Sequence, residues 1–259
     1  LGRLGSVLAP AGTTTAGRPL LNLSYALNHA TGGRAVVGYH VVNVAIHALA
    51  ALALFGLVRR TPRRAGAPAG VPTDELALLV ALLWAVHPLL TNSVTYLSQR
   101  AESLMGLWYL LTLYAFARAA TSARPARWLT VSVVACAAGM LTKEVMITAP
   151  VVVLLYDRVF LASGFRSALA RRLWYYAGLA ACWVLLGWLM VSTGLGERDV
   201  GFRAGDDWVH YAFTQCRVLV QYVRLALVPY PLVFDYGQEI LVRRFVDAAA
   251  WLPLVLAAL

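Results

Sequence analysis

Charged side chains are scarce in this chain of 259 residues, because only 13% of them are Asp, Glu, Lys or Arg. A soluble domain carries nearer about 25% charged residues, so the composition excludes an ordinary water-soluble domain. Hydrophobic residues make up 60% of the sequence, and the mean hydropathy is +0.68. Apolar runs recur roughly every 30 to 40 residues, which indicates several membrane-spanning helices. The runs are continuous and do not alternate, which argues against a β-barrel.

Cysteine is also rare, and its three residues cannot complete a disulfide framework. Cys136, Cys182 and Cys216 all fall within expected helices, so we interpret them as small core residues. They are not spaced as metal ligands, and we predict no metal site. No signal peptide is recognisable. The chain does not begin with Met and stops within an apolar run at Leu259, so we expect a fragment truncated at both ends.

Acidic residues are outnumbered by basic ones, 12 to 22, which gives a formal net charge of +10. In a soluble protein this excess would suggest a nucleic-acid partner. Here most arginines lie in short loops between apolar runs, which is the orientation signal of a membrane protein. We therefore expect a lipid bilayer as the surroundings and no nucleic acid as a partner.

The predicted fold class is all-α: a polytopic transmembrane bundle of about six to seven spans with additional interfacial helices, forming one membrane domain over residues 1–259. A span needs about 20 apolar residues. A helix at Leu20–Ala30 is too short to cross, and one at Trp208–Val228 is long enough but carries many polar residues. The expected spans are Ala35–Val58, Glu75–Leu89, Ser103–Arg118, Trp128–Leu141, Val145–Leu161 and Leu173–Thr193, with a further one beginning at Ala248.

The dense basic loop after the first span, Arg59 to Arg64, predicts the orientation of the whole chain. Such a loop is expected to be cytoplasmic. Every other basic-rich loop then falls on the same side. The stretch His87–Glu102 and the pair Lys143-Glu144 face the opposite side, which we predict to be periplasmic.

Polar side chains occur inside the first span, where His40, Asn43 and His47 are spaced i, i+3 and i+7. At about 100° per residue they lie within roughly 60° of one another on the helix. Ionisable groups at membrane depth usually line a cavity or pair internally. Asn and His also hydrogen-bond across packed spans. Both interpretations, cavity lining and helix–helix contact, stay open at this point.

Two outer segments contain groups suited to binding an anion. His87 could donate a hydrogen bond to a phosphate or a hydroxyl, and Arg100 could pair with Glu102 or with phosphate; the alternative is a capped, solvated loop. Lys143 could bind an anionic group while Glu144 orients it or pairs with another segment. The alternative there is a solvated turn at the membrane surface.

The strongest pattern lies in the polar helix near the end of the chain, where His210, Thr214, Arg217, Gln221 and Arg224 form one stripe. Their spacing places them within roughly 80° of one another on a helix. Two arginines on one stripe can bind a phosphate bidentately. The alternative is an interfacial helix whose arginines meet lipid headgroups.

Six short motifs follow one another in order along the chain. They are R-P-L-x-N-L-S-Y-A-L-N (Arg18 to Asn28), G-Y-H-V-V-N-V-x-I-H (Gly38 to His47), H-P-L-x-T-x-S-V-T-Y (His87 to Tyr96), Q-R-A-E-S-L-M-G-L (Gln99 to Leu107), L-T-K-E-V-M-x-T-A-P (Leu141 to Pro150) and P-L-x-F-D-Y-G (Pro231 to Gly237). Together they resemble the membrane part of bacterial relatives of the TMTC (transmembrane and tetratricopeptide-repeat) proteins. Those proteins belong to the GT-C superfamily of polyprenyl-phosphate-sugar glycosyltransferases. The ordered set is specific and covers nearly the whole chain.

This resemblance implies a GT-C-like fold in a bacterial inner membrane, with its active side in the periplasm and tetratricopeptide repeats after the membrane domain. It implies transfer of a sugar, expected to be mannose, from a polyprenyl phosphate to a hydroxyl of an acceptor protein. A lipid-linked donor does not strictly need a metal, because protein cations can take the phosphate charge, so we predict no metal or other cofactor. The leaving phosphate would be held by fixed cations. Our candidates for binding the substrates are Arg217, Arg224, Arg100 and Lys143, with Glu144, Glu102, Gln221, Asn43, His40, His47 and His87 as further polar residues of the site.

Two departures from the family weaken the assignment of a catalytic residue. Asn92 stands where the family usually has a glutamate, and the family's catalytic Asp lies in a first outer loop that would precede Leu1. We therefore expect the general base upstream of this chain and assign it to no residue here. Two alternative functions stay open: a transporter or flippase for a lipid-linked or anionic solute, and a membrane scaffold without catalytic activity.

Overall fold

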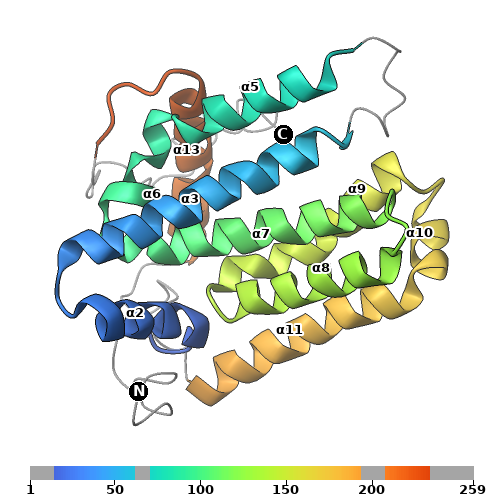
Figure 1. Ribbon diagram of the computed structural model, residues 1–259, viewed down its shortest axis with the longest axis horizontal. Helices are drawn as coiled ribbons and strands as arrows, with labels where there is room; N and C mark the ends of the chain where they lie inside the picture. Colours follow the sequence, from blue (N-terminus) through green and yellow to red (C-terminus); the bar gives the residue numbers. More distant parts are fainter. Residues whose placement is uncertain (1–14, 62–70, 194–207, 234–259) are drawn as a thin grey trace. The chain divides into compact units, whose positions relative to one another are not determined.

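Figure 1 shows the computed structural model of the protein, which describes residues 15–61, 71–193 and 208–233. The chain divides into two compact units, Leu1–Leu195 and Gly196–Leu259. Every regular element in the described ranges is a helix, which confirms the all-α prediction. In the first unit the elements are α2 (Pro19–Gly32), α3 (Val36–Val58), α5 (Thr73–Ala85), η1 (Pro88–Leu90), α6 (Thr91–Thr95), η2 (Leu97–Gln99), α7 (Arg100–Ala119), α8 (Pro125–Met140), η3 (Glu144–Thr148), α9 (Ala149–Phe160), α10 (Phe165–Arg171) and α11 (Leu173–Thr193); the second unit contains α13 (Trp208–Leu227).

Helix α7 lies at the centre of the first unit and packs against α3 on one side and α8 on the other (Figure 1). Lipid tails are as apolar as leucine, so such helices associate through close packing and interhelical hydrogen bonds. The contact with α3 is formed by Ile46, Ala50, Leu104 and Leu107. A larger cluster joins α7 to α8, η3, α9 and α11; its buried members are Leu113, Phe116, Cys136, Met140, Met146, Ala149, Val153, Tyr175, Leu179, Cys182 and Leu186. The two cysteines in it are free thiols, as predicted for core residues.

Two described helices are long and apolar enough to cross a membrane by themselves, α3 with a mean hydropathy of 2.3 and α11 with 1.6. Two bent pairs also qualify if each counts as one span: α5 with η1 and α6, and the segment from η3 to α9 with α10. The remaining expected spans are helical at the predicted places, but α8 has only 16 residues, fewer than the about 20 that a straight crossing needs. The total of six to seven spans stays a prediction.

The second expected span is broken where the sequence contains Pro88. A proline disfavours helical backbone at the residue before it, and His87 accordingly has an extended conformation with φ −65° and ψ 129°. Helix α5 therefore ends at Ala85, four residues before the predicted end at Leu89. The chain continues in η1 and α6 at an angle of 53° to α5.

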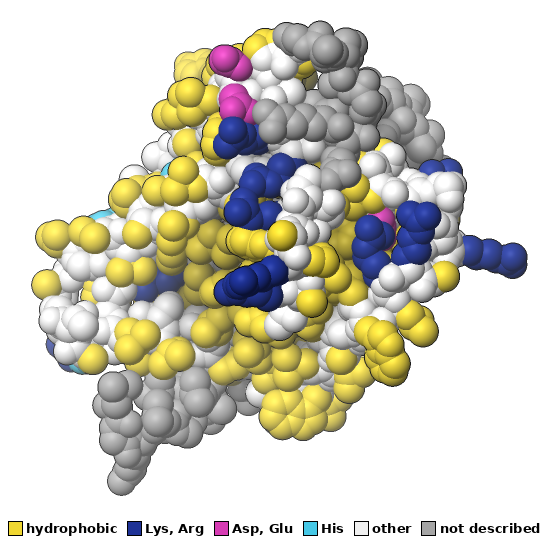
Figure 2. Space-filling model, turned by 45° about the vertical axis from the view of Figure 1, so that its right-hand side comes forward, with side chains coloured by type: hydrophobic (Ala, Val, Ile, Leu, Met, Phe, Trp, Pro, Cys, Tyr) yellow, Lys and Arg dark blue, Asp and Glu magenta, His cyan; other side chains and the backbone are white. Residues whose placement is uncertain are grey.

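The ends of α3, α7 and α9 and the starts of α5, α8 and α11 lie at one end of the first unit (Figure 1). We call it the basic end, defined by its arginines: Arg59, Arg60, Arg118, Arg124, Arg127, Arg158, Arg166, Arg171 and Arg172. Figure 2 brings this side forward and shows Lys and Arg side chains set in a largely hydrophobic surface. The opposite end, which we call the α2 end, contains α2, the short helices after α5, and the turn from α8 into η3. This grouping agrees with the alternation expected from the basic loops.

Candidate functional site

The α2 end brings together motifs that are far apart in the sequence. The backbone N–H of Leu20 donates to the carbonyl of Leu141, 3.1 Å away, which joins the start of α2 to the end of α8. The Tyr25 hydroxyl donates to the carbonyl of Leu97 over 2.8 Å, which joins α2 to η2. These two hydrogen bonds attach α2 to the end of α8 and to η2, the short helix that precedes α7.

Arg100 is the residue on which this arrangement depends, and its side chain is fully buried. Its guanidinium donates to Asn43 Oδ1 over 2.8 Å and to Asn28 Oδ1 over 2.7 Å. It also donates to the backbone carbonyl of Tyr39 over 2.9 Å and lies 4.6 Å from the ring centre of Tyr25. Because these partners belong to α2 and α3 and Arg100 begins α7, the one side chain joins three helices.

The predicted partners of Arg100 differ from the observed ones. We expected it to pair with Glu102 or with a phosphate, but it donates to two asparagines and two backbone carbonyls inside the protein. A guanidinium has donors in a planar fork that can reach several helices at once, which suits it to this internal role. Asn43 shares the burial, and its Nδ2 has no hydrogen-bond partner among the described residues. Arg100 and Asn43 are therefore buried residues that hold α2, α3 and α7 together, and neither lies on the protein surface.

Burial also affects the tyrosine that covers this arginine. Desolvation raises the pKa of the Tyr25 hydroxyl above its ordinary value, and the positive charge of Arg100 opposes part of that rise. The hydroxyl consequently keeps its proton at neutral pH and remains a donor to the carbonyl of Leu97. The position of η2 relative to α2 is thus held by a neutral hydrogen bond.

Two ion pairs at the α2 end join segments that are far apart in the sequence. Lys143 contacts Glu102 of α7, and Arg18 contacts Glu144 over 3.3 Å. Lys143 and Glu144 are neighbours in sequence, and each pairs with a distant segment, as the sequence suggested for Glu144. The acids are the more accessible partners, since the side chains of Glu102 and Glu144 are 43% and 36% exposed.

In each pair a carboxylate neutralises the cation, so the charges of the two pairs sum to zero. Each cation is less accessible than its acid, with side-chain exposures of 17% for Lys143 and 15% for Arg18. If an anion displaced the carboxylates, partly buried cations would stabilise its charge more than they would in open water. These four residues, Arg18, Glu102, Lys143 and Glu144, are called the outer charge cluster below.

The two histidines of α3 lie against the broken second span. The ring of His40 hydrogen-bonds through Nδ1 to the carbonyl of Val94, 3.1 Å away, at the end of α6. The ring of His47 hydrogen-bonds through Nε2 to the carbonyl of Ala85, 2.8 Å away, at the end of α5, and stacks on Trp84. Carbonyls at helix ends have no partner within their helix. The structure thus favours helix–helix contact over cavity lining for these two residues.

His87 and Asn92 lie at the same end of the first unit, in and beside the short helices that follow α5. Nδ1 of His87 accepts a hydrogen bond from the backbone N–H of Leu89 over 3.3 Å and so caps η1. Asn92 is exposed on α6. The role of His87 toward a phosphate or a hydroxyl stays a prediction.

The predicted stripe near the end of the chain lies on α13, in the second unit. Nη1 of Arg224 donates to Gln221 Oε1 over 3.4 Å, and its Nη2 donates to the carbonyl of Tyr230 over 3.1 Å. The first contact confirms that Arg224 and Gln221 share a helix face, as their spacing predicted. Arg217 is partly buried on the same helix, and the side chain of His210 lies outside the described residues.

Four residues that contact Arg100 or belong to the outer charge cluster were not predicted as site residues: Arg18, Tyr25, Asn28 and Tyr39. All of them belong to the first two motifs that carry the family resemblance. The signal was therefore present, but their partners lie tens of residues away, and Arg18 and Glu144 are 126 positions apart. Periodicity within one helix cannot reveal such pairs.

Comparison with known proteins agrees with the motifs. Residues 19–190 match the family model described as dolichyl-phosphate-mannose-protein mannosyltransferase. The chain is 31% identical to Protein O-mannosyl-transferase Tmtc2 of Drosophila melanogaster over 92% of its own length and 26% of that protein. It is 32% identical to Protein O-mannosyl-transferase TMTC2 of Homo sapiens over 59% of its length and 18% of that protein.

The chain thus spans about a quarter or less of the curated relatives it matches. No solved structure matches it. The family match includes α2, α3, α7, the outer charge cluster except Arg18, and most of α11. On this basis the chain is a multi-pass membrane protein that belongs to the dolichyl-phosphate-mannose-protein mannosyltransferase family.

Proposed function

We propose that this chain is part of a membrane glycosyltransferase that moves mannose from a polyprenyl-phosphate donor to a Ser or Thr hydroxyl of a protein. The reaction would take place on the periplasmic side of a bacterial inner membrane, at the α2 end. The family match and the names of the relatives support the transferred sugar and the protein acceptor. The arginines at the basic end support the orientation, because basic loops face the cytoplasm.

One observation carries the proposal: the outer charge cluster is assembled from three family motifs that meet only in the folded chain. Arg18 comes from the first motif, Glu102 from the fourth, and Lys143 and Glu144 from the fifth. The two pairs hold Lys143 and Arg18 in place, and each cation is less exposed than its carboxylate partner. An incoming phosphate can replace the carboxylates as the partner of both cations.

In the proposed reaction the acceptor hydroxyl loses its proton to a general base while its oxygen attacks C1 of the mannose. The bond between C1 and the phosphate oxygen breaks, and the electron pair leaves with the polyprenyl phosphate. Lys143 and Arg18 would stabilise the charge that develops on the phosphate, so that no metal is needed. Glu102 and Glu144 are engaged in ion pairs, and the proposal assigns the base to neither.

The test is a transfer assay with the full-length protein in membranes. Synthetic polyprenyl-phosphate-[³H]mannose is supplied, and label released from precipitated protein by mild base under reducing conditions is counted as O-linked mannose. We expect Lys143→Ala to lower the rate about 100-fold, the usual effect of removing one donor to a developing anion. Arg166→Ala, an exposed arginine of α10, is the control and should leave the rate unchanged.

Two results contradict the proposal at different levels. If the unaltered protein yields no base-released mannose, the activity itself is wrong. If it does, but Lys143→Ala and Arg166→Ala behave alike, the activity stands and the outer charge cluster is not its phosphate site. The arginines of α13 are tested separately: unchanged donor affinity in Arg217→Ala with Arg224→Ala would remove them from the donor site.

A further inference from the structure

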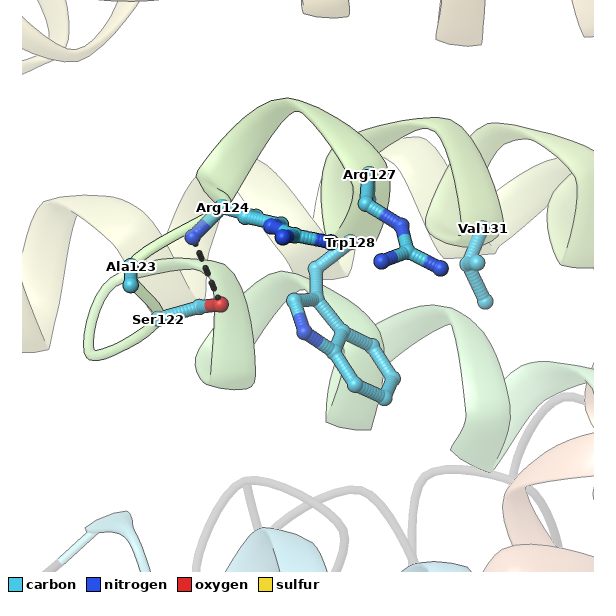
Figure 3. A pocket seen from close by; sticks show the side chains of 6 residues that line it. All are labelled: Ser122, Ala123, Arg124, Arg127, Trp128 and Val131. Carbon is cyan, nitrogen blue, oxygen red and sulfur yellow. Dashed lines mark hydrogen bonds between the residues drawn. The ribbon is translucent and has the colours of Figure 1, made fainter.

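A hollow of about 380 Å³ lies at the basic end, far from the outer charge cluster along the helices, where the turn after α7 leads into α8. Figure 3 shows its lining, with the side chains of Arg124 and Arg127 beside the ring of Trp128. The turn is closed by a hydrogen bond of 3.1 Å from the Arg124 backbone N–H to Ser122 Oγ. No residue that lines the hollow is acidic.

The two arginines of the hollow differ from others at the same end. Arg59 and Arg172 hold carboxylates in ion pairs of 2.6 and 2.8 Å, and Arg118 lies 4.4 Å from the ring centre of Trp128. The guanidinium groups of Arg124 and Arg127, in contrast, are exposed and have neither a hydrogen bond nor an ion pair within the described part of the chain. They also lie at the start of α8, where the first backbone N–H groups have no partner within the helix.

An apolar stripe continues from these arginines along α8. Arg127, Val131 and Val134 are spaced i, i+4 and i+7 and therefore lie on one helix face. Val131 and Val134 are 45% and 60% exposed, and Val131 also lines the hollow. A soluble phosphate would use the arginines but gain nothing from the stripe. A molecule with a phosphodiester at one end and acyl chains below it matches both.

From this arrangement we infer that the hollow is a binding site for an anionic glycerophospholipid. The phosphodiester would lie between the Arg124 and Arg127 guanidinium groups, which can bind it through their planar forks. The tryptophan would lie at the level of the headgroup, where its amphipathic ring is favoured in membrane proteins. The acyl chains would follow Val131 and Val134. The site is independent of mannosyl transfer, because it lies at the other end of the helices.

The experiment is native mass spectrometry of the full-length protein, purified in detergent and supplied with phosphatidylglycerol or with phosphatidylcholine of the same chains. The unaltered protein should retain phosphatidylglycerol preferentially. Arg124→Gln with Arg127→Gln should weaken that retention about 10- to 30-fold, as expected from about 1 kcal/mol for each basic residue near an anionic lipid. Arg166→Gln with Arg171→Gln removes the same charge from α10 and should change retention little.

Several outcomes would overturn the inference. Equal retention of the two lipids by the unaltered protein does so without any variant, which keeps the test valid even if a variant fails to fold. Equal losses in the two double variants would mean that net charge, and not the hollow, attracts the lipid. Displacement of phosphatidylglycerol by millimolar inorganic phosphate would mean an anion site without a lipid-specific part, whereas continued retention supports the lipid.

Discussion

Replacing Arg100 should weaken the protein more than any other single arginine substitution at the α2 end. Arg100→Met keeps much of the volume but removes every donor. It leaves the oxygens of Asn28, Asn43 and the Tyr39 carbonyl without the guanidinium that now lies 2.7 to 2.9 Å away. Each buried acceptor left unsatisfied costs about 1 to 3 kcal/mol. Because the three share one partner, their losses are not independent, and we expect about 3 to 5 kcal/mol in all.

Arg100→Lys is the more informative variant because it retains the charge. A lysine has one nitrogen at the end of a flexible chain and cannot reach acceptors on α2 and α3 together. We expect it to lose about 2 kcal/mol, roughly two of the three hydrogen bonds. If charge alone mattered, the lysine variant would be as stable as the unaltered protein.

The measurement is unfolding of the detergent-solubilised full-length protein by increasing denaturant, with hydrogen exchange of residues 19–32 recorded in parallel. Exchange is needed because the first event should be release of α2 from α3 and α7, before the rest of the bundle opens. Arg166→Met serves as the control and should cost less than about 0.5 kcal/mol. Unchanged protection of α2 in Arg100→Met would refute the reasoning, whatever the global stability.

Three further substitutions follow from the packing of the first unit. Gly139→Ala would place a carbon 2.6 Å from the sulfur of the methionine in η3 and should lower the free energy of unfolding by about 1 to 3 kcal/mol. The control Gly187→Ala, with nothing within 4 Å of the added carbon, should be neutral or stabilising. Equal effects of the two substitutions on denaturant unfolding would contradict the tight contact. Asp157→Asn removes the charge that binds Arg172 at 2.8 Å and should lower the free energy of unfolding by about 1.5 to 3 kcal/mol. A stability equal to that of the unaltered protein would show that the ion pair makes no net contribution. His47→Ala leaves the last carbonyl of α5 unsatisfied and should lower the free energy of unfolding by about 1 to 3 kcal/mol. Hydrogen exchange around the break in the second span should increase. Unchanged exchange would argue for a solvated carbonyl.

Helix positions could be predicted from the sequence wherever an apolar run was long and closed by recognisable ends. The expected Ala35–Val58 and the observed α3 differ by one residue, and Leu173–Thr193 agrees with α11 at both ends. The expected second span, Glu75–Leu89, ends early because proline restricts the residue before it. Its first helix, α5, stops at Ala85, and the last carbonyl of α5 bonds to another helix.

Side-chain partners could be predicted only within one helix. The shared face of Gln221 and Arg224 follows from their spacing, and the structure confirms it. Arg100 was expected to pair with Glu102 or with a phosphate. Its actual partners, Asn28 and Asn43, lie 72 and 57 positions away, and only the folded bundle places them around it. These pairings therefore could not be derived from spacing within a helix.

The contacts of His40 and His47 have a consequence for where their protons are. A carbonyl oxygen only accepts, so each ring must carry hydrogen on the nitrogen that faces it. In their neutral forms His40 is then the Nδ1–H tautomer and His47 the Nε2–H tautomer, although both belong to one helix and meet the same broken span. Nitrogen-15 spectra of the two rings should differ accordingly.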